Sequence, residues 1–390
     1  MRIVMITDVY FPRVNGVSTS IRTFRRELEA QGHEVFLIAP DYGEPTDDEH
    51  GIMRVPSRIV YVDPEDRMMR FGKVMALMER LHELAPDLIH IQTPFIAHYA
   101  GIRLARRLGV PTVLTYHTYF EEYLYYYIRF LPRSLLRWSV RHYSRRQCSQ
   151  VDAVVVPTKA FDAVLDSYGV SGKRHINPTG IDLTRFAHGG DGADFKHQRG
   201  IAPSRPNLIF VGRIVHEKNI DFLLRVVANI KHTIPEILFT IAGEGPAEGY
   251  LRHEVGELKL DDNIHWVGNL DLQHELLDCY CSGDVFVFAS RTETQGLVLL
   301  EAMALGVPVV STAKMGTCDI LAPGLGALVS DESVGGFSEK VVRILRDEVL
   351  AKRLSDEGKE YVNNWSAAEA SKRLVRIYME TILHKSGGGD

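Results

Sequence analysis

The chain contains no long apolar segment. A membrane-spanning helix needs about 18 consecutive apolar residues, and no apolar run in the chain approaches that length. We therefore expect no helix that crosses a bilayer. The apolar run within Met1–Phe11 is too short for a secretory signal, and we interpret it as a first strand.

Cysteine is also scarce, with 4 residues in 390. The spacing of these cysteines matches no metal-ligand pattern, and Cys279 and Cys281 lie in a helical pattern that predicts buried thiols rather than a redox pair. We therefore expect a reduced, cytoplasmic protein.

An excess of positive charge is missing as well. Lys plus Arg number 45 against 50 for Asp plus Glu, which gives a formal net charge of -5. No nucleic-acid partner is therefore expected, and any affinity for an anionic surface must come from a local patch.

The sequence does contain a regular alternation of short apolar runs and longer amphipathic stretches. Its length of 390 residues fits two domains of ordinary size. Strands that alternate with helices predict the α/β class, with parallel sheets wound by right-handed crossovers. The predicted strands are Ile3–Thr7, Val35–Ala39, Leu88–Ile91, Thr112–Tyr116 and Ala153–Val156, then Leu208–Val211, Leu238–Ala242, His265–Val267, Val285–Ala289, Val307–Ser311 and Ala327–Val329.

The alternation lapses between residues 177 and 200, where Gly189–Gly192 indicates a hinge region. We therefore predict one domain over residues 1–185 and a second over residues 200–366. Two such sheets facing each other form a cleft, and ligands bind at the carboxyl ends of their strands.

The segment 286–311 carries the most specific pattern. A buried strand and a polar turn are predicted before a helix that begins at Gly296, whose first amides can bind an anion. Glu293 and Glu301 bracket this point, and Glu301 is expected roughly 7–8 Å along the helix from Gly296. This separation suits a ligand with hydroxyls at both ends and a phosphate between them, such as a nucleotide-sugar. Two solvated glutamates on a surface helix are the alternative.

The same segment carries further landmarks after the second glutamate. The full set is Glu293, Glu301, Ala302, Met303, Gly306 and Pro308. Together these residues resemble the donor site of family-4 retaining glycosyltransferases. The resemblance implies the GT-B fold, in which two Rossmann-like doubly wound domains face a cleft. It also implies that a last helix, about 367–385, crosses back onto the first domain.

A second pattern follows the predicted strand at 208–211. Gly212 permits a tight turn, and Arg213 and Lys218 match the family's Gly-Arg-x₄-Lys pattern. Both cations can stabilise a departing nucleoside diphosphate. Metal-dependent transferases hold a divalent ion with an Asp-x-Asp pair instead, and this chain has none. We therefore expect no metal and no cofactor. Two solvated surface charges are the alternative.

The resemblance assigns further residues to the donor. Glu293 is implied to bind the donor sugar and Glu301 the ribose hydroxyls. Turns at strand ends and two helix starts are implied to supply most of the remaining contacts. The donor-binding set is Gly16, Gly212, Gly243, Glu244, Gly268, Asn269, Gly296, Leu297, Val298 and Glu301. Many relatives carry two adjacent glycines where this chain has Asn15 and Gly16.

His117 follows a predicted strand end. In the resembled family a histidine at this place lies against the transferred sugar, so the predicted catalytic residues are His117, Glu293, Arg213 and Lys218. Retention is usually explained there by front-face attack, with the leaving phosphate assisting deprotonation of the acceptor. His117 is then expected to orient the sugar. A satisfied structural histidine is the alternative.

The segment from Tyr116 to Arg146 is basic, aromatic and amphipathic. Arginines recur at every fourth residue from Arg129 to Arg145, which places them in one stripe on a helix. At about 1 kcal/mol per basic residue near an anionic surface, such a stripe could hold the protein on a membrane reversibly. The predicted acceptor and membrane residues are Tyr119, Glu122, Tyr123, Arg129, Arg133, Arg137 and Arg141. An exposed helix whose arginines pair with nearby acids is the alternative.

The stretch His117-Thr118-x₂-Glu121-Glu122-x-Leu124 resembles bacterial diacylglycerol glucosyltransferases, and the chain is also similar to phosphatidylinositol mannosyltransferases. We therefore expect a metal-independent retaining glycosyltransferase that moves a hexose, most simply glucose from UDP-glucose, to a membrane lipid such as diacylglycerol. Its expected location is cytoplasmic, peripheral on the inner face of the plasma membrane. The alternatives are a soluble, polysaccharide or lipopolysaccharide acceptor, a GT-B sugar-nucleotide epimerase, and a non-catalytic binding module.

Overall fold

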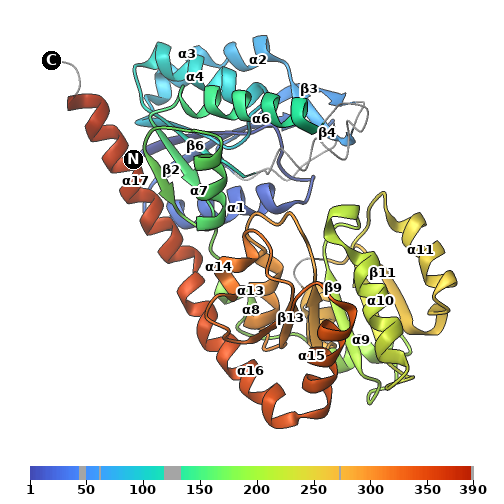
Figure 1. Cartoon of the computed structure of the whole chain (residues 1–390). Helices are drawn as coiled ribbons and strands as arrows, with labels where there is room; N and C mark the ends of the chain where they lie inside the picture. The colour runs from blue at the N-terminus through green and yellow to red at the C-terminus, as the bar shows by residue number, and fades with distance from the viewer. Residues whose placement is uncertain (44–49, 61–62, 118–132, 272–273, 388–390) are drawn as a thin grey trace. The chain divides into compact units, whose positions relative to one another are not determined.

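The computed structural model describes residues 1–43, 50–60, 63–117, 133–271 and 274–387. The chain divides into two compact units, and Figure 1 shows that each is a sheet covered by helices. Unit 1 comprises Met1–Gly180 and Ala367–Asp390, and unit 2 comprises Ile181–Ser366. Within the described residues, no helix is long and apolar enough to span a membrane.

Unit 1 is built on a sheet with the strand order β4-β3-β2-β1-β5-β6-β7-β8. All neighbouring strands are parallel except β3 and β4. The order from β3 to β7 is that of a dinucleotide-binding fold, with a switch point between β1 and β5. The strands are β1 (Arg2–Ile6), β2 (Glu34–Asp41), β3 (Ile52–Val60), β4 (Asp63–Met69), β5 (Leu88–Ile91), β6 (Thr112–Thr115), β7 (Ala153–Val156) and β8 (Arg174–Ile176).

The helices of unit 1 include one from the far end of the chain. They are α1 (Gly16–Ala30), α2 (Phe71–Met75), α3 (Met78–Leu84), α4 (Ile96–Leu108), α6 (Arg133–Cys148), α7 (Lys159–Ser167) and α17 (Ala367–Gly387). Leu374 and Tyr378 of α17 are buried in one apolar cluster with Phe24 and Leu28 of α1. The C-terminal helix therefore completes the core of unit 1.

Unit 2 repeats this arrangement with a parallel sheet in the order β11-β10-β9-β12-β13-β14. Its strands are β9 (Asn207–Val211), β10 (Leu238–Ala242), β11 (Ile264–Gly268), β12 (Val285–Phe288), β13 (Val309–Ser311) and β14 (Ala327–Val329). Its helices are α8 (Leu183–Phe186), α9 (Gly192–Gln198), α10 (Ile220–Lys231), α11 (Glu248–Glu257), α12 (Glu275–Cys281), α13 (Leu297–Ala304), α14 (Thr317–Leu321), α15 (Val334–Arg346) and α16 (Glu348–Tyr361). The switch point lies between β9 and β12.

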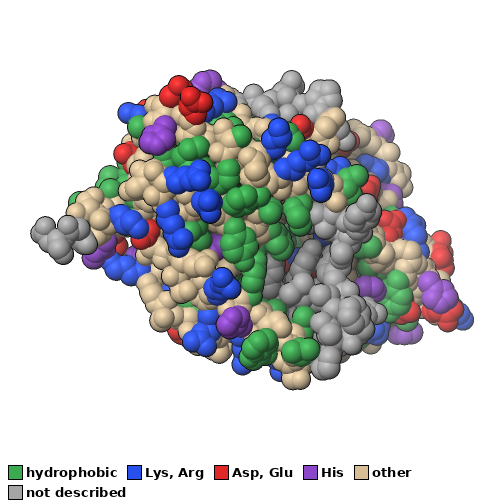
Figure 2. Space-filling view, turned by 90° about the horizontal axis from the view of Figure 1, so that it is seen from above, with side chains coloured by type: hydrophobic (Ala, Val, Ile, Leu, Met, Phe, Trp, Pro, Cys, Tyr) green, Lys and Arg blue, Asp and Glu red, His purple; other side chains and the backbone are tan. Residues whose placement is uncertain are grey.

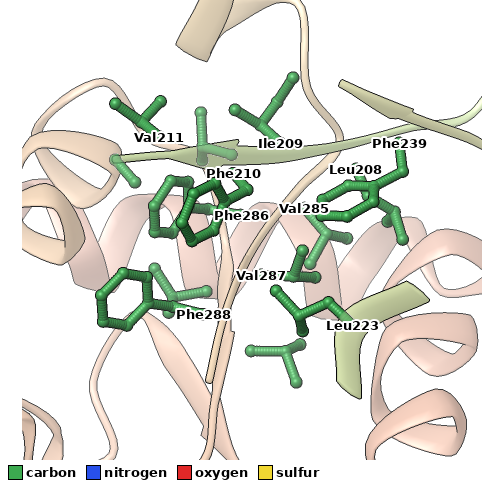
Figure 3. Close-up of a cluster of buried hydrophobic side chains, with 14 of the residues drawn as sticks. Leu208, Ile209, Phe210, Val211, Leu223, Phe239, Val285, Phe286, Val287 and Phe288 are labelled. Atoms are coloured by element: carbon green, nitrogen blue, oxygen red, sulfur yellow. The ribbon is translucent and has the colours of Figure 1, made fainter. Parts of the chain in front are cut away.

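An aromatic cluster fixes β9 against β12 at this switch point. The Phe288 ring is stacked on Phe210 and Phe286, with ring centroids 6.0 and 6.1 Å apart. Figure 3 shows these rings among buried aliphatic side chains of the same two strands. Close packing of this kind leaves little freedom at the strand ends, so the turns after Val211 and Phe288 begin from a rigid base.

The predicted hinge region between residues 177 and 200 was wrong in part. Residues 181–200 form part of unit 2 and include α8 and α9. The glycines that suggested a hinge serve close packing instead. A Cβ atom on Gly190 or Gly192 would overlap the backbone of α12.

The prediction of two Rossmann-like α/β domains in a GT-B arrangement is confirmed at the level of the two sheets. Three strands were missed, namely β3, β4 and β8. The sequence of β4, Asp63–Met69, is rich in charged residues and contains no apolar run. Such edge strands carry little of the apolar signal on which strand prediction depends.

Candidate active site

Three glycines form the carboxyl edge of β9, β10 and β11 in unit 2. The Gly212 amide donates to the Ala242 carbonyl over 3.0 Å, and the Gly243 amide donates to the Gly268 carbonyl over 2.8 Å. A Cβ atom on Gly243 would overlap the carbonyl oxygen of Gly212. The turns therefore lie close together only because this position lacks a side chain. All three belong to the predicted donor-binding set, as do the exposed residues Glu244 and Asn269 beside them.

The two predicted cations follow this edge. Arg213 and Lys218 lie in the loop after β9, and both are half-buried. The Lys218 ammonium forms an ion pair with the Glu293 carboxylate, and it lies 5.8 Å from the centroid of the Phe288 ring. The structure therefore brings together two of the four predicted catalytic residues, from loops that follow adjacent strands.

A network that the sequence did not indicate holds the Lys218 loop in place. Asn219 is buried and adopts a left-handed conformation with φ of 58°. Its side-chain amide donates to the Ala289 carbonyl over 3.3 Å and to Glu332 over 3.2 Å. Glu332 also pairs with Arg291, whose hydrogen bond lowers the pKa of the carboxyl. The only local signal was an asparagine directly after the lysine, because asparagine tolerates this backbone conformation.

The amino end of α13 lies next to this ion pair. Gly296 is the residue before the helix and has φ of 94°, which favours glycine. The amides of Leu297 and Val298 begin the helix, and Gly296, as a glycine, supplies no side-chain cap. Such amides and the helix dipole favour an anion. The predicted phosphate position therefore has both a helix start and cations within one unit.

The Glu293 backbone is held by the loop after β13. The Gly316 amide donates to the Glu293 carbonyl over 2.8 Å. A Cβ atom on Gly316 would overlap the Thr294 carbonyl. Ala313 and Met315 in this loop both have positive φ, which is uncommon for residues with a side chain. This contact was not predicted from the sequence.

Glu301 lies in a separate polar cluster. Its carboxylate accepts a hydrogen bond of 2.9 Å from the Tyr280 hydroxyl and lies 3.9 Å from the Arg185 guanidinium. Burial and the charge of Glu301 raise the pKa of Tyr280 well above its usual value. The Glu301 side chain is 13% exposed, so the carboxylate is partly accessible while its orientation is fixed. Sequence reasoning found Glu301 but not Tyr280 or Arg185.

In unit 1, Gly16 begins α1 in open space. Among the described residues, no atom lies within 4 Å of a Cβ built on Gly16, apart from its chain neighbours and the backbone of its own helix. Asn15 caps the helix, because its side chain accepts a hydrogen bond of 2.9 Å from the Ser18 amide. The asparagine that departs from the family pattern therefore has a clear local role.

His117 lies just beyond the end of β6 in unit 1. Its Nε2 is 2.9 Å from the Oε1 of Gln92, a buried residue that follows β5. Burial lowers the pKa of His117 to about 4, so the ring is neutral near pH 7. A neutral imidazole can accept or donate a hydrogen bond but carries no charge to a ligand.

Asp8 lies at the carboxyl end of β1 and was not among the predicted site residues. Its carboxylate accepts a hydrogen bond of 2.8 Å from the Thr93 hydroxyl and bonds of 3.1 and 3.2 Å from the Ala97 amide. Burial raises the pKa of Asp8 to about 6. The carboxylate thus caps α4, whose preceding residue offers no side-chain cap.

The predicted arginine stripe is only partly within the described residues. Tyr119, Glu122, Tyr123 and Arg129 lie outside them, and Arg133 is described only as the first residue of α6. Arg137 and Arg141 lie on the exposed face of α6, where Trp138 is 64% exposed. The Trp138 ring stacks on His142, and the Arg141 guanidinium lies 5.6 Å from the centroid of the Tyr168 ring. Figure 2 shows basic and hydrophobic side chains interspersed on the surface seen in that view.

Both halves of the chain match glycosyltransferase families. The family described as Glycosyl transferases group 1 matches residues 192–361, and Glycosyltransferase Family 4 matches residues 14–185. The α-monoglucosyldiacylglycerol synthase of Streptococcus pneumoniae is 30% identical over 98% of this chain and 86% of its own length. The chain therefore belongs to the GT-B glycosyltransferases that these two families describe, and it is an enzyme of that class.

The names of other relatives indicate different transferred sugars. An α-monoglucosyldiacylglycerol synthase of Acholeplasma laidlawii is 28% identical over 80% of each chain. A GDP-mannose-dependent α-mannosyltransferase of Mycobacterium tuberculosis is 29% identical over 87% of this chain and 86% of its own. Among solved structures, sucrose-phosphate synthase of Thermosynechococcus elongatus has a TM-score of 0.79 at 22% identity, covering 98% of this chain and 99% of its own. That likeness shows the fold.

Proposed function

We propose that this protein is a retaining glycosyltransferase that transfers glucose from UDP-glucose to diacylglycerol or a closely related membrane lipid. The observation that supports the donor part of this proposal is the ion pair of Lys218 and Glu293 beside the amino end of α13. The lipid half is supported by relatives named for glucosyldiacylglycerol synthesis.

The chemistry follows from the charges at this edge. A nucleoside diphosphate placed at the amino end of α13 meets helix amides and the cations Arg213 and Lys218, which stabilise the charge that develops as it leaves. Lys218 then turns from Glu293 toward the phosphate, and Glu293 becomes available to sugar hydroxyls. Glu301, held by Tyr280, takes the ribose hydroxyls.

Retention is assigned to front-face attack, in which the leaving phosphate takes the proton of the acceptor hydroxyl. His117, neutral because of its low pKa, orients the sugar rather than serving as the base. No metal ion and no cofactor enter this scheme, since cations of the protein meet the diphosphate.

The donor is tested with purified enzyme, diacylglycerol and a panel of UDP-glucose, GDP-mannose and an ADP-sugar. We expect a glucolipid from UDP-glucose alone, with retained α configuration by NMR of the product. GDP-mannose is the second candidate, because several relatives are named for it. Formation of a mannolipid would show that the donor is GDP-mannose rather than UDP-glucose. Formation of an epimerised sugar nucleotide would favour the epimerase alternative.

The lipid acceptor implies residence on a membrane surface, cytoplasmic and peripheral on the inner face of the plasma membrane. The exposed α6 face carries Arg137, Arg141 and Arg145 with Trp138 among them. Basic residues with an exposed aromatic residue favour adsorption to anionic lipid.

We expect the charge reversal Arg137→Glu/Arg141→Glu to abolish flotation with anionic vesicles and to lower lipid glucosylation about tenfold. The matched control is Arg343→Glu/Arg346→Glu on α15, which also reverses two exposed arginines. Flotation that is unchanged in the α6 variant would favour the soluble-acceptor alternative, in which these arginines form ordinary surface contacts.

A further inference from the structure

A chain of buried polar side chains leads from His117 into the core of unit 1. The Nε2 atom of His117 is 2.9 Å from Oε1 of Gln92, and Nε2 of Gln92 is 3.0 Å from Nδ1 of His90. The same Nδ1 atom of His90 lies 2.6 Å from the Tyr378 hydroxyl, and Nε2 of His90 lies 2.7 Å from the Thr115 hydroxyl. These side chains come from β5, β6 and α17 and from the residues that follow β5 and β6.

Because these side chains are buried, each hydrogen-bond donor in the series needs an acceptor within it. His90, Gln92 and Tyr378 are only 1%, 3% and 0% exposed. A buried polar atom without a partner is costly, so donors must face acceptors along the whole chain. Burial also lowers the pKa of His90 to about 3, with a smaller contribution from His117. Both rings are therefore neutral, and each carries a proton on only one nitrogen.

Gln92 couples the two rings because the two ends of its amide differ. Nδ1 of His90 faces both the NH₂ group of Gln92 and the Tyr378 hydroxyl. Because the amide NH₂ can only donate, Nδ1 accepts and is shared by the two donors, and the Nε2–H of His90 donates to Thr115. The oxygen of Gln92 faces Nε2 of His117, which must donate. The Nδ1 atom of His117 is then left as a hydrogen-bond acceptor. Turning the amide over would reverse the proton position on both rings.

We infer that Gln92 is a positioning residue that fixes the Nε2–H tautomer of His117 and so leaves Nδ1 to accept a hydrogen bond from a substrate hydroxyl. His90 fixes the orientation of Gln92, and Tyr378 fixes His90. The inference rests on the proposed function for the substrate hydroxyl, while the tautomer itself follows from the contacts of Gln92. The C-terminal helix thus contributes to the site through two intermediate side chains.

The direct test needs no substrate. Histidine is labelled with ¹⁵N in the full-length enzyme, and the ring signals of His117 are identified by their loss in His117→Asn. We expect a neutral Nε2–H tautomer with a pKa near 4 in the ligand-free protein. A neutral Nδ1–H tautomer in the wild-type protein would overturn the inference without any variant of Gln92.

Two substitutions of Gln92 extend the test. Gln92→Glu places a carboxylate against both rings, and an adjacent opposite charge raises a histidine pKa by about one unit or more. We expect this rise at His117, together with an equal shift of the acidic limb of the kcat profile. Gln92→Leu removes both partners, and we expect mixed His117 tautomers with about tenfold lower kcat and little change in the KM for the lipid.

The control is Gln147→Leu. Gln147 is another buried glutamine of unit 1, and it is only 1% exposed. It donates to the Pro94 carbonyl and, within the part of the chain that the structure describes, forms no hydrogen bond with His117. We expect its His117 spectrum to match wild type. A His117 tautomer and pKa that stay unchanged in both Gln92 variants would show that Gln92 only fills space. If UDP-glucose gives no product while the NMR results hold, the proposed donor fails and the role of Gln92 stands.

Discussion

The two units share a strand order but present opposite chemistry at the carboxyl ends of their strands. The edge of unit 2 carries ionised groups, with Lys218 against Glu293 and Glu301 near Arg185. At the described edge of unit 1, Asp8 caps α4, and the other polar side chains are neutral, with His117 joined to Gln92 and the buried His90 behind them. The shared fold therefore supplies a platform, while loop residues decide whether it suits a diphosphate or hydroxyl groups.

The difference also concerns how each edge is held. In unit 2, the ion pair of Lys218 and Glu293 is half-buried, and the proposed mechanism requires it to open when a diphosphate binds Lys218. In unit 1, the hydrogen-bonded side chains from His117 to Tyr378 are neutral, so no ion pair has to open there. Their hydrogen bonds fix the orientation of the His117 ring. Preorganised neutral groups of this kind cost little reorganisation when a ligand binds.

The largest expected effect comes from removing the charges of unit 2. We expect Glu293→Ala, Arg213→Ala and Lys218→Ala each to lower turnover more than tenfold, which is over about 1.4 kcal/mol of barrier. Steady-state kinetics with saturating donor measure this. The control is Lys352→Ala, which breaks an exposed lysine–aspartate pair on α16. Wild-type turnover in any of the three site variants would contradict the assignment.

A smaller effect is expected at the second carboxylate. Glu301→Gln keeps the shape and one hydrogen bond to Tyr280 but removes the charge. We expect the KM for the donor to rise about tenfold, a loss of about 1.4 kcal/mol, with a smaller change in kcat. A fall in kcat at unchanged KM would instead place Glu301 at the transferred sugar.

The two neutral histidines and Asp8 of unit 1 predict a pH dependence of stability. The folded pKa values of His90 and His117 are about 3 and about 4, below the ordinary 6.5. As the pH falls from 6.5, the unfolded chain binds protons that the folded chain does not, so the free energy of unfolding decreases. Asp8 opposes this below its folded pKa of about 6, because the folded state then binds the proton.

Two histidines outweigh one carboxyl, so we expect the melting temperature to fall between about pH 6.5 and about pH 4. Differential scanning calorimetry over this range measures it. His90→Leu removes one of the two histidines and should flatten the slope, although it also lowers stability at pH 7. A steeper slope in His90→Leu would show that the ring is charged in the folded protein.

No change at all is expected from metal removal. With Arg213 and Lys218 as the cations at the diphosphate, dialysis against a chelator should leave turnover within experimental error. Restoration of lost activity by added divalent ions would overturn the metal-independent mechanism and sharpen the contrast in charge between the two edges.

The sequence predicted those features that are encoded locally. Gly212, Arg213 and Lys218 follow a strand with fixed spacing, and Glu293 and Glu301 flank a helix start, so these positions could be found from the chain alone. The resemblance to a family then named their roles. His117 could be found only through that resemblance, since one histidine at a strand end has no distinctive local pattern.

The residues that the sequence did not reveal act over long separations. Glu332 reaches Asn219 across 113 positions, and Tyr378 reaches His90 across 288. Spacing along the chain carries no signal for such pairs. Gly190 and Gly192 were misinterpreted as part of a hinge. Glycine is also needed where the backbone packs closely against α12, so the residue type alone cannot distinguish the two cases.

The position of α17 has a consequence for synthesis of the chain. Unit 2 is continuous, whereas unit 1 needs residues that are translated after all of unit 2. Until α17 leaves the ribosome, the apolar surface of α1 around Phe24 and Leu28 lacks its cover, and His90 lacks the Tyr378 hydroxyl. A nascent or prematurely terminated chain therefore contains all of unit 2 but only an unfinished unit 1.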